Sequence, residues 1–420
     1  MIILILYITF FTASFFVVTY LQRNKKVKGI NSRKTVTFGD ESAVIPNKVA
    51  AVISILGFFF LWGAFTGSIL TPIHVPGPFI GETSFTYTAI NANGETDSAT
   101  VFAKVHKIGE VVDKPETKTR EGFLQDDATV VGAWRTKLIK VKNNDEGGKK
   151  EGFQITAIDG KPVSEKNAIK VKDGSVVLTS KGSLNFSPDK GWQLEPIWLP
   201  PPENVVSRFI DIIKNGYQNF SLVEHLGWSL FRVIFGFLLG ALVGIPLGYA
   251  MGLSGWFRGW FDPIVEFMRP VPPLALIPLV IIWFGIWETG KIVLLFLASL
   301  WIMTIAARAG VSGINISKVH AAYSLGVSKF QLLRFVILPN SLPEIFTGAR
   351  VAMGVCWGTV VAAELVAAQK GAGMMIIAAS KFQLTDIVIM GIILIGLIGY
   401  GIDILMRKAE NWLVPWKGRV

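Results

Sequence analysis

The stretch from Val233 to Gly252 reads VIFGFLLGALVGIPLGYAMG and contains no charged side chain. A helix of this length spans the hydrocarbon core of a bilayer, which is about 30 Å thick. Glycine recurs at every fourth residue, at Gly236, Gly240, Gly244, Gly248 and Gly252. Residues four apart share a helix face, so these glycines predict a smooth strip that another helix can approach closely. We expect the strip to serve helix packing, and contact with a transported molecule is the alternative.

Composition extends this membrane assignment to most of the chain. Of 420 residues, 51% are hydrophobic and 17% charged, and the mean hydropathy is +0.48, which is typical of a polytopic membrane protein. There are 41 basic and 30 acidic residues, but residues 72–200 hold 17 of each, so the surplus lies in the apolar remainder. This distribution indicates basic cytoplasmic loops and disfavours nucleic-acid binding. Cys356 is the single cysteine and the four histidines are scattered, so neither a disulfide nor a metal site is expected.

Two apolar stretches begin the chain. Within residues 1–47, the run Ile2–Tyr20 is followed by a basic cluster of Arg23, Lys25, Lys26, Lys28, Arg33 and Lys34. A cleaved signal peptide carries its positive charge first, so we expect an extra, uncleaved span with its N-terminus outside and a basic cytoplasmic loop. A signal peptide is the alternative. A second span is expected at 48–71, and it leads back to the outer face.

Residues 72–198 have a different composition. Short apolar runs alternate with polar residues, as at Phe85, Tyr87 and Ala89, and Asn-Gly or Asp-Gly pairs separate them. Alternation with such turns predicts strands and hairpins. We therefore expect a small β-rich domain inserted on the periplasmic face. It contains no recognisable catalytic cluster, and a structural insertion is the expectation.

The remaining residues, 199–420, begin with Leu199-Pro200-Pro201-Pro202 and an amphipathic segment at 205–213. Five further spans are predicted at about 227–252, 263–286, 291–310, 347–368 and 386–406. Seven crossings from an outside N-terminus place the C-terminus in the cytoplasm. Basic residues on that side agree, both in the loop after the fifth span and in the tail: Arg308, Lys318, Lys329, Arg334, Arg407, Lys408, Lys417 and Arg419.

Two spans contain residues that are unusual at membrane depth. The fourth has the run Arg269-Pro270-Val271-Pro272-Pro273. Each proline lacks a backbone donor, so this span is either a broken helix lining a pathway or a kinked helix in a packed bundle. Glu364 lies inside the sixth span and is expected to face the bundle interior, in a structural hydrogen bond or in contact with substrate or gate. The pathway candidates are Arg269, Pro272, Pro273 and Glu364.

Two arginines lie near the ends of predicted spans. Arg232 is near the start of the third span and Arg350 near the start of the sixth. A long basic side chain near a helix end can extend to the interface, so we expect both residues to do so or to pair at helix ends, rather than to bind a ligand.

The loop 311–346 is more amphipathic than a connector. His320-Ala321-Ala322-Tyr323-Ser324-Leu325-Gly326 predicts a helical turn of small residues and a glycine break, and a second short helix with a proline stop is expected before Pro339. The apolar face of this second helix is predicted at Phe330, Leu333, Val336 and Ile337. Such a loop fits either a partner's groove or the lipid surface.

This loop resembles the EAA loop of ATP-binding-cassette (ABC) importer permeases. Ala321, Ala322, Gly326, Leu338 and Pro339 match the family pattern, whereas His320 stands where a glutamate is frequent and Val336 where isoleucine is. From Leu199 to Val420 the chain resembles the nitrate/sulfonate/taurine group, through LPPPENVV, SLFRVIFGF, RPVPPLALIPLVIIWFGIWETGKI, SLGVSKFQLLRFVILPNSLPEIFTGAR and VVAAELVAA. RPVPPLA, LPEIFTG and PWKG are most similar to taurine permeases.

The resemblance implies an all-α membrane protein, a type I ABC importer bundle of about seven helices with the β-rich insert. It implies a permease for taurine or a related sulfonate in the bacterial inner membrane, working with a second copy, a periplasmic binding protein and ABC ATPases. The coupling loop, with His320, Ala321, Ala322, Gly326, Leu338 and Pro339, would dock on the ATPase, which uses ATP and magnesium. This chain itself contains no phosphate-binding loop and is expected to bind no cofactor.

Three alternatives stay open. The cargo could be nitrate, bicarbonate or another small anion. An ion-driven secondary transporter would predict inverted repeats and acidic residues in several spans. A membrane-anchored periplasmic binding or assembly module would make 72–198 the working part.

Overall fold

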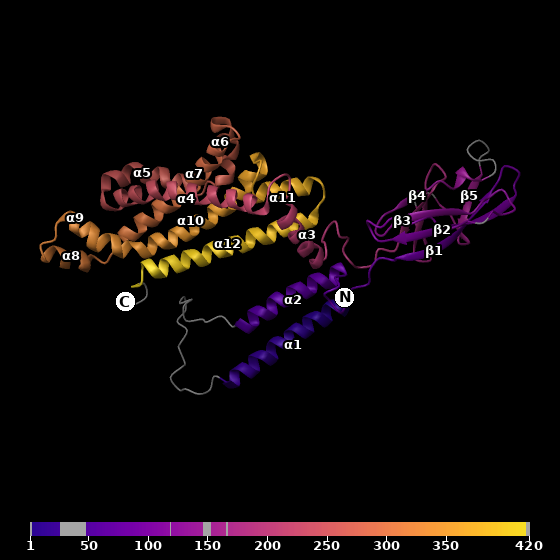
Figure 1. Ribbon diagram of the computed structural model, residues 1–420, viewed down its shortest axis with the longest axis horizontal. Helices are drawn as coiled ribbons and strands as arrows, with labels where there is room; N and C mark the ends of the chain where they lie inside the picture. The colour runs from indigo at the N-terminus through magenta and orange to yellow at the C-terminus, as the bar shows by residue number, and fades with distance from the viewer. Residues whose placement is uncertain (1, 26–47, 118, 146–152, 165–166, 417–420) are drawn as a thin grey trace. The chain divides into compact units, whose positions relative to one another are not determined.

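The computed structural model describes residues 2–25, 48–117, 119–145, 153–164 and 167–416, and Figure 1 shows their arrangement. The chain forms two compact units, Met1–Glu203 and Asn204–Val420. The predicted basic loop between the first two spans, and the tail residues Lys417 and Arg419, lie outside the described residues.

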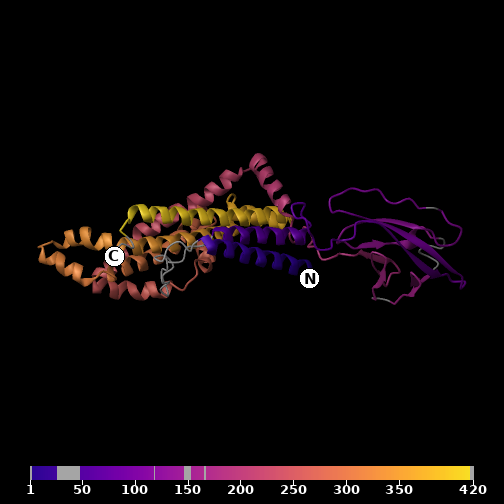
Figure 2. The same cartoon turned by 90° about the horizontal axis from the view of Figure 1, so that it is seen from below.

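The first unit begins with two apolar helices, α1 (Ile2–Lys25) and α2 (Lys48–Thr66). They lie side by side in Figures 1 and 2, and the Phe11 and Phe60 rings meet across them at 6.3 Å. Gly57 allows this approach, because a Cβ there would lie 3.2 Å from Phe11. Both segments are predominantly apolar, and a helix satisfies the backbone hydrogen bonds of such a segment internally.

Residues 81–188 of this unit contain two β-sheets, which confirms the β-rich prediction. The five-stranded sheet has the order β3 (Asp127–Gly132), β2 (Thr96–His106), β1 (Gly81–Ile90), β5 (Gln154–Ile158) and β6 (Lys161–Pro162). The four-stranded sheet has the order β4 (Lys137–Ile139), β9 (Leu184–Pro188), β8 (Gly174–Leu178) and β7 (Ile169–Val171), and a short 3-10 helix, η3 (Val141–Asn143), follows β4. β2 and β3 are parallel, and the other pairs are antiparallel.

The alternating pattern explains how the two sheets share a core. Phe85, Tyr87 and Ala89 alternate along β1 and are buried. Phe85 stacks on Phe186 of β9 with ring centroids 5.5 Å apart, so the two sheets pack face to face. The predicted turn at Asp159-Gly160 has φ of 45° and 71°, the left-handed geometry of a tight hairpin.

The second unit is helical. It contains α4 (Leu222–Leu253), α5 (Gly255–Met268), the 3-10 helix η4 (Pro273–Leu276), α6 (Ile277–Phe284), α7 (Glu288–Ser312), α8 (Ile316–Ser324), α9 (Lys329–Leu332), the π-helix η5 (Leu333–Ile337), α10 (Leu338–Ala367), α11 (Ala372–Lys381) and α12 (Thr385–Leu413). The amphipathic helix α3 (Pro202–Asn215) leads into it.

Among the described residues, five helical segments are long and apolar enough to cross a membrane: α2, α4, α7, Lys329–Val366 and α12. The pair α5 and η4–α6 makes a sixth if it is counted as one broken span, and α1 adds the shorter apolar stretch Ile5–Tyr20.

The predicted span over 263–286 consists of two helices, which agrees with the broken-helix alternative. The chain bends by 91° between α5 and the helix from Pro273 to Phe284. Pro270, Pro272 and Pro273 lack backbone donors, so a continuous helical ladder cannot pass this point, and the helix is broken rather than kinked. Helix α11 was not predicted, because it is too short to read as a span.

The glycine strip of α4 faces α7. A Cβ at Gly240 would collide with the Ser299 hydroxyl and lie 2.8 Å from the Phe296 carbonyl. At Gly244 it would lie 2.7 Å from the Leu300 carbonyl. The obstacles are backbone atoms, which cannot move aside as a flexible side chain can. Glycine is therefore required for the two axes to lie this close.

The predicted proline stop is wrong. Pro339 lies in the first turn of α10, where its missing N–H is not needed by the helix. It therefore follows η5 into a longer helix instead of ending the amphipathic segment.

Candidate functional site

Arg232 lies at the centre of a buried ionic cluster in the second unit. Its side chain is fully buried, and its Nε and Nη2 donate to the two carboxylate oxygens of Glu288 at 2.6 and 2.7 Å. Its Nη1 donates to Glu364 Oε1 at 2.6 Å and to the Lys370 carbonyl at 2.9 Å. The prediction that Arg232 extends to the membrane interface is wrong, because acceptors from α7 and α10 meet it inside the bundle.

Glu364 is also held by donors from α4 and α11. Its side chain is buried and accepts from Ser229 Oγ at 2.8 Å and from the Gly373 N–H at 3.0 Å. The Ala372 N–H donates to Ser229 Oγ at 2.9 Å, so the first turn of α11 closes over the cluster. Backbone N–H groups at a helix start have no partner within the helix, which explains why they are free to bind here. Both oxygens of this carboxylate therefore have a hydrogen-bond donor.

Glu288 connects the cluster to a second cation. Lys291, one turn further along α7, is 7% exposed and donates to Glu288 Oε1 at 3.0 Å. Two cations and two carboxylates from α4, α7 and α10 thus neutralise one another. A neutral, fully hydrogen-bonded group is the form in which charges persist in a low-dielectric bundle. The cluster therefore ties these helices together at one end.

The proline break lies beside this end of the bundle, but Arg269 does not join the cluster. Val280, just after the break, packs with Leu294 of α7 and with Ala363, the neighbour of Glu364. Arg269 is largely exposed and lies 3.7 Å from Glu266. A cavity of about 20 Å³ next to Val280 has room for a single water molecule. The pathway candidates are thus not brought together into one site in this conformation.

Other ion pairs involve the same helices away from this cluster. Arg308, near the end of α7, pairs with Asp262 and Glu266 of α5. Arg350 of α10 pairs with Glu410 near the end of α12, so the expected pairing is present, but Arg350 itself lies near the middle of α10 and not at a helix end. Glu288 is the first residue of α7 and Arg308 lies in its last turns, so the ionic cluster and the Arg308 pairs lie toward opposite ends of α7.

Figure 1 shows α8 and α9 at one end of the helical unit and α11 toward the other. Ala322, Leu332 and Ile337 are buried together with Val311 at the end of α7. Gly326 separates the two short helices with φ of +74°, a conformation that favours glycine. The buried face therefore holds Leu332, which was not predicted, and Phe330 is not part of it.

The outer surface of this loop is apolar and open. Tyr323, Leu325, Phe330 and Phe335 are each more than half exposed. Of the remaining predicted loop residues, His320 and Ala321 are exposed, Leu338 is 44% exposed and Pro339 is half-buried. Large apolar groups exposed to water on a short helical pair do not stabilise an isolated chain. This surface therefore fits contact with a partner.

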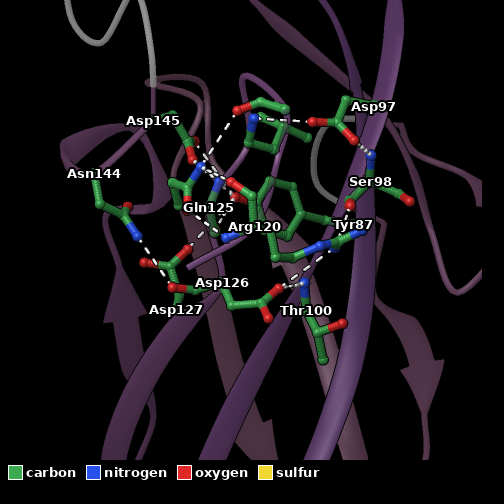
Figure 3. A network of polar contacts seen from close by, with 12 residues as sticks. Tyr87, Asp97, Ser98, Thr100, Arg120, Gln125, Asp126, Asp127, Asn144 and Asp145 are labelled. Atoms are coloured by element: carbon green, nitrogen blue, oxygen red, sulfur yellow. Dashed lines mark hydrogen bonds and ion pairs between the residues drawn. The ribbon is translucent and has the colours of Figure 1, made fainter. Parts of the chain in front are cut away.

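A second polar cluster lies in the β-rich unit (Figure 3). The Tyr87 hydroxyl lies 3.5 Å from Asp127 Oδ2 and 3.3 Å from Asp145 Oδ2. Burial and the neighbouring Asp145 raise the pKa of Asp127 to about 7, and burial raises the pKa of Asp145 to about 6. Arg120 pairs with Asp126 at 3.5 Å instead. No group of three or more His, Cys, Asp or Glu residues with metal-site geometry occurs among the described residues.

A bundle of membrane-length helices, broken at a proline run and carrying an apolar helical pair at one end, is typical of a polytopic membrane protein. A family profile described as "binding-protein-dependent transport system inner membrane component" matches residues 236–414. The chain is 46% identical over 228 residues to the taurine transport system permease protein TauC of Escherichia coli, covering 54% of this chain and 83% of that protein.

Two further relatives widen the comparison. The aliphatic sulfonates transport permease protein SsuC of Escherichia coli is 40% identical, over 54% of this chain and 84% of that protein. The nitrate import permease protein NrtB of Synechococcus elongatus is 31% identical, over 53% of this chain and 80% of that protein. The chain belongs to the binding-protein-dependent inner-membrane permeases of ABC importers. It is therefore a multi-pass inner-membrane transport subunit, and the profile match does not include the β-rich unit.

Proposed function

We propose that this chain forms the translocation pathway of an ATP-driven importer for taurine or a closely related sulfonate. The observation that carries the proposal is the 46% identity to a taurine permease, which exceeds the 40% and 31% identities to sulfonate and nitrate permeases. Nitrate, bicarbonate or another small anion is the alternative cargo. A periplasmic binding protein would deliver the molecule to a pair of these chains.

The loop α8–α9 is proposed to dock on an ABC ATPase that binds ATP and magnesium. Its exposed residues Tyr323, Leu325 and Phe330 supply an apolar contact surface, and Gly326 lets the chain reverse direction between the helices. Because η5 continues directly into α10, and Val311 of α7 shares the buried face of the loop, a displacement of the loop moves both helices. This gives a direct route from nucleotide binding to the membrane.

Glu288 lies on α7 and Glu364 on α10, and both are at the end of the bundle away from the α8–α9 loop. A shift of α7 relative to α10 would change the distances from both carboxylates to Arg232. Packed ionic interfaces have few stable arrangements, so the cluster would favour discrete states over gradual deformation. In alternating access, ATP binding would turn the pathway outward and hydrolysis would reset it. The broken helix at Arg269, Pro272 and Pro273 is proposed to line that pathway beside Glu364.

The proposed orientation places the C-terminus and α8–α9 in the cytoplasm and residues 72–198 in the periplasm. Arg308, Lys318, Lys329 and Arg334 support this side for the loop. Reporter fusions in the β-rich unit test it: a periplasmic reporter should be active there, and a cytoplasmic reporter active at the same position would overturn the topology.

Uptake by the assembled importer tests the cargo. Proteoliposomes containing this chain, its ATPase and its binding protein should accumulate labelled taurine only with ATP. Unlabelled taurine should compete best, short alkanesulfonates next, and nitrate or bicarbonate least. Competition by nitrate alone would exclude a sulfonate cargo, and uptake without the ATPase would exclude the ABC assignment.

Gly326 tests the coupling loop. Gly326→Leu should abolish uptake while the protein remains in the membrane, because a bulky residue at positive φ costs roughly 1–2 kcal/mol and enlarges the turn. Gly326→Asn tolerates this backbone better and should keep part of the activity. Gly259→Leu is a matched control on α5, since a Cβ at Gly259 has open space around it. Normal ATP-dependent uptake by Gly326→Leu would show that this loop does not couple.

A further inference from the structure

Two connecting segments of the first unit expose large apolar side chains. Residues 67–80 join α2 to β1, and residues 190–203 follow β9 and enter α3. Ile69 is 88% exposed, Trp192 72% and Trp198 77%, and Leu70 and Ile73 are also exposed. We call these two segments the collar. Exposed apolar residues gathered on two short segments indicate a surface that contacts something other than water.

Hydrogen bonds fix the depth of the collar relative to the two membrane helices. The Tyr7 hydroxyl donates to the Ile73 carbonyl at 2.9 Å, and Tyr7 lies about 8 Å inside the end of α1 at 1.5 Å per residue. The Trp62 indole donates to the Pro200 carbonyl at 2.9 Å, and Trp62 lies about 6 Å before the end of α2. Both segments are therefore bonded to the terminal turns of these two apolar helices.

The collar backbone is bonded to the end of α2. The Val75 N–H donates to the Ala64 carbonyl at 3.1 Å, and the Leu194 N–H donates to the Phe65 carbonyl at 2.9 Å. These are carbonyls that the last turn of a helix leaves without an internal partner. Irregular backbone is tolerated close to hydrocarbon only when its polar groups are satisfied in this way.

Lys190 at the start of the second segment is exposed, whereas Gln193, Glu195 and Glu203 have partners within this unit. Glu203 accepts from Ser68 Oγ at 2.6 Å and from the Ile69 N–H at 3.0 Å. Several positions have no backbone donor at all, since they are prolines: Pro72, Pro76, Pro78, Pro196, Pro200, Pro201 and Pro202. Because these segments have few unpaired backbone donors, replacing the water around them with lipid costs little free energy.

We propose that the collar is embedded in the interfacial layer of the phospholipid leaflet on the side of the β-rich unit, with Trp192 and Trp198 as anchors. Tryptophan suits this layer because its ring is apolar and its N–H reaches the polar headgroups. Hydrogen bonds to Tyr7, Trp62 and the last carbonyls of α2 hold the collar at the ends of two apolar helices, which favours lipid over a docked protein. The β-rich unit would then be anchored at two points on the membrane surface rather than carried on free linkers.

Site-directed labelling of the full-length protein tests this proposal. In a Cys356→Ala background, Trp192→Cys, Trp198→Cys and Ile69→Cys are labelled singly with a fluorophore and reconstituted in phosphatidylcholine nanodiscs. Val111→Cys is the control, because Val111 is fully exposed on a loop of the β-rich unit. Brominated acyl chains should quench the three collar labels several-fold and leave the Val111 label unchanged.

Three labelling sites protect the test against a variant that does not fold, and size-exclusion profiles identify such a variant. Collar labels that brominated lipid does not quench would overturn the proposal. If those labels are instead shielded when the periplasmic binding protein is added, the collar is a protein-docking face and the lipid assignment is wrong. None of these outcomes depends on transport, so the result is independent of the proposed cargo and of the coupling loop.

Discussion

The two units bury carboxylates in opposite ways. In the helical unit, the buried Glu364 and the partly exposed Glu288 share the guanidinium of Arg232, so the buried carboxylate has a cation as its partner. In the β-rich unit, Asp127 and Asp145 converge on the hydroxyl of Tyr87, which carries a single proton to donate. The bilayer offers no water to a stranded charge, so a membrane bundle must pair it. A domain that borders water can keep a carboxyl group protonated instead.

The largest expected effect comes from breaking the paired cluster. Arg232→Met leaves Glu364 buried without its cation, and loss of one partner of a buried pair costs about 3–5 kcal/mol. The thermal unfolding midpoint of the detergent-solubilised protein should fall sharply. Arg269→Met is the matched control, since Arg269 is 66% exposed, and should change the midpoint little.

A double variant separates charge burial from lost packing. Arg232→Met combined with Glu364→Gln removes the stranded charge and should recover part of the lost stability. If the double variant is as unstable as Arg232→Met alone, the cost lies in packing, and the contrast between the two units does not rest on charge.

The sequence predicted the existence of these helices better than the place of Arg232. A predicted start at 227 put Arg232 near a helix end, whereas α4 begins at Leu222 and the arginine lies three turns inside. Ser221 and Glu224 form a capping box there, with the Glu224 N–H donating to Ser221 Oγ at 3.2 Å. The Ser-x-x-Glu spacing is visible in the sequence, and it was the signal that could have moved the boundary.

Other parts of the site could not be predicted from local patterns. The glycine strip was predictable because its period equals the helix repeat. Helix α11 and its contact with Glu364 were not predictable. Glycine is needed at Gly371 and Gly373 only because α10 packs closely against them, which no local pattern shows. The partners of Arg232 come from residues 56 and 132 positions away, and no periodicity links them.

A second prediction tests whether close helix packing holds the cluster together. Gly240→Ala would place a Cβ against Ser299 and the α7 backbone, forcing α4 and α7 apart at a cost of about 1–3 kcal/mol. The unfolding midpoint should fall, though less than for Arg232→Met. Gly354→Ala is the control, because a Cβ there meets nothing within 4 Å, and it should be neutral or slightly stabilising. Equal effects of the two substitutions would mean that the strip does not set the helix spacing.

The third prediction concerns pH and the unpaired cluster. Asp127 has a folded pKa of about 7 against an ordinary value of 3.8, so its contribution to stability is complete below about pH 4 and is lost as pH rises through 7. Asp127→Asn removes this loss and should stabilise the β-rich unit by about 1 kcal/mol at pH 8, with little change at pH 4. Hydrogen exchange of β1 and β2 in the full-length protein, corrected for intrinsic rates, measures it.

Asp113→Asn serves as the comparison for that measurement, since Asp113 is exposed in the same unit. Its exchange should have the same pH dependence as the unsubstituted protein. Asp127→Asn could instead lower the protection from exchange equally at pH 4 and pH 8. That result would indicate a lost hydrogen bond rather than relief of an unfavourable ionisation. The two units would then not differ in the way proposed.

The smallest expected effect separates pairing from burial. Lys104 and Glu82 lie opposite each other on β2 and β1 with Nζ 3.1 Å from Oε1, a distance similar to those around Arg232. Both side chains are exposed, so water already solvates the charges and salt screens them. Lys104→Ala should therefore change stability by less than about 0.5 kcal/mol, as measured by the same exchange experiment. A loss comparable to that of Arg232→Met would mean that ion-pair geometry alone governs stability here, whereas a negligible loss assigns the difference to the absence of water around Arg232.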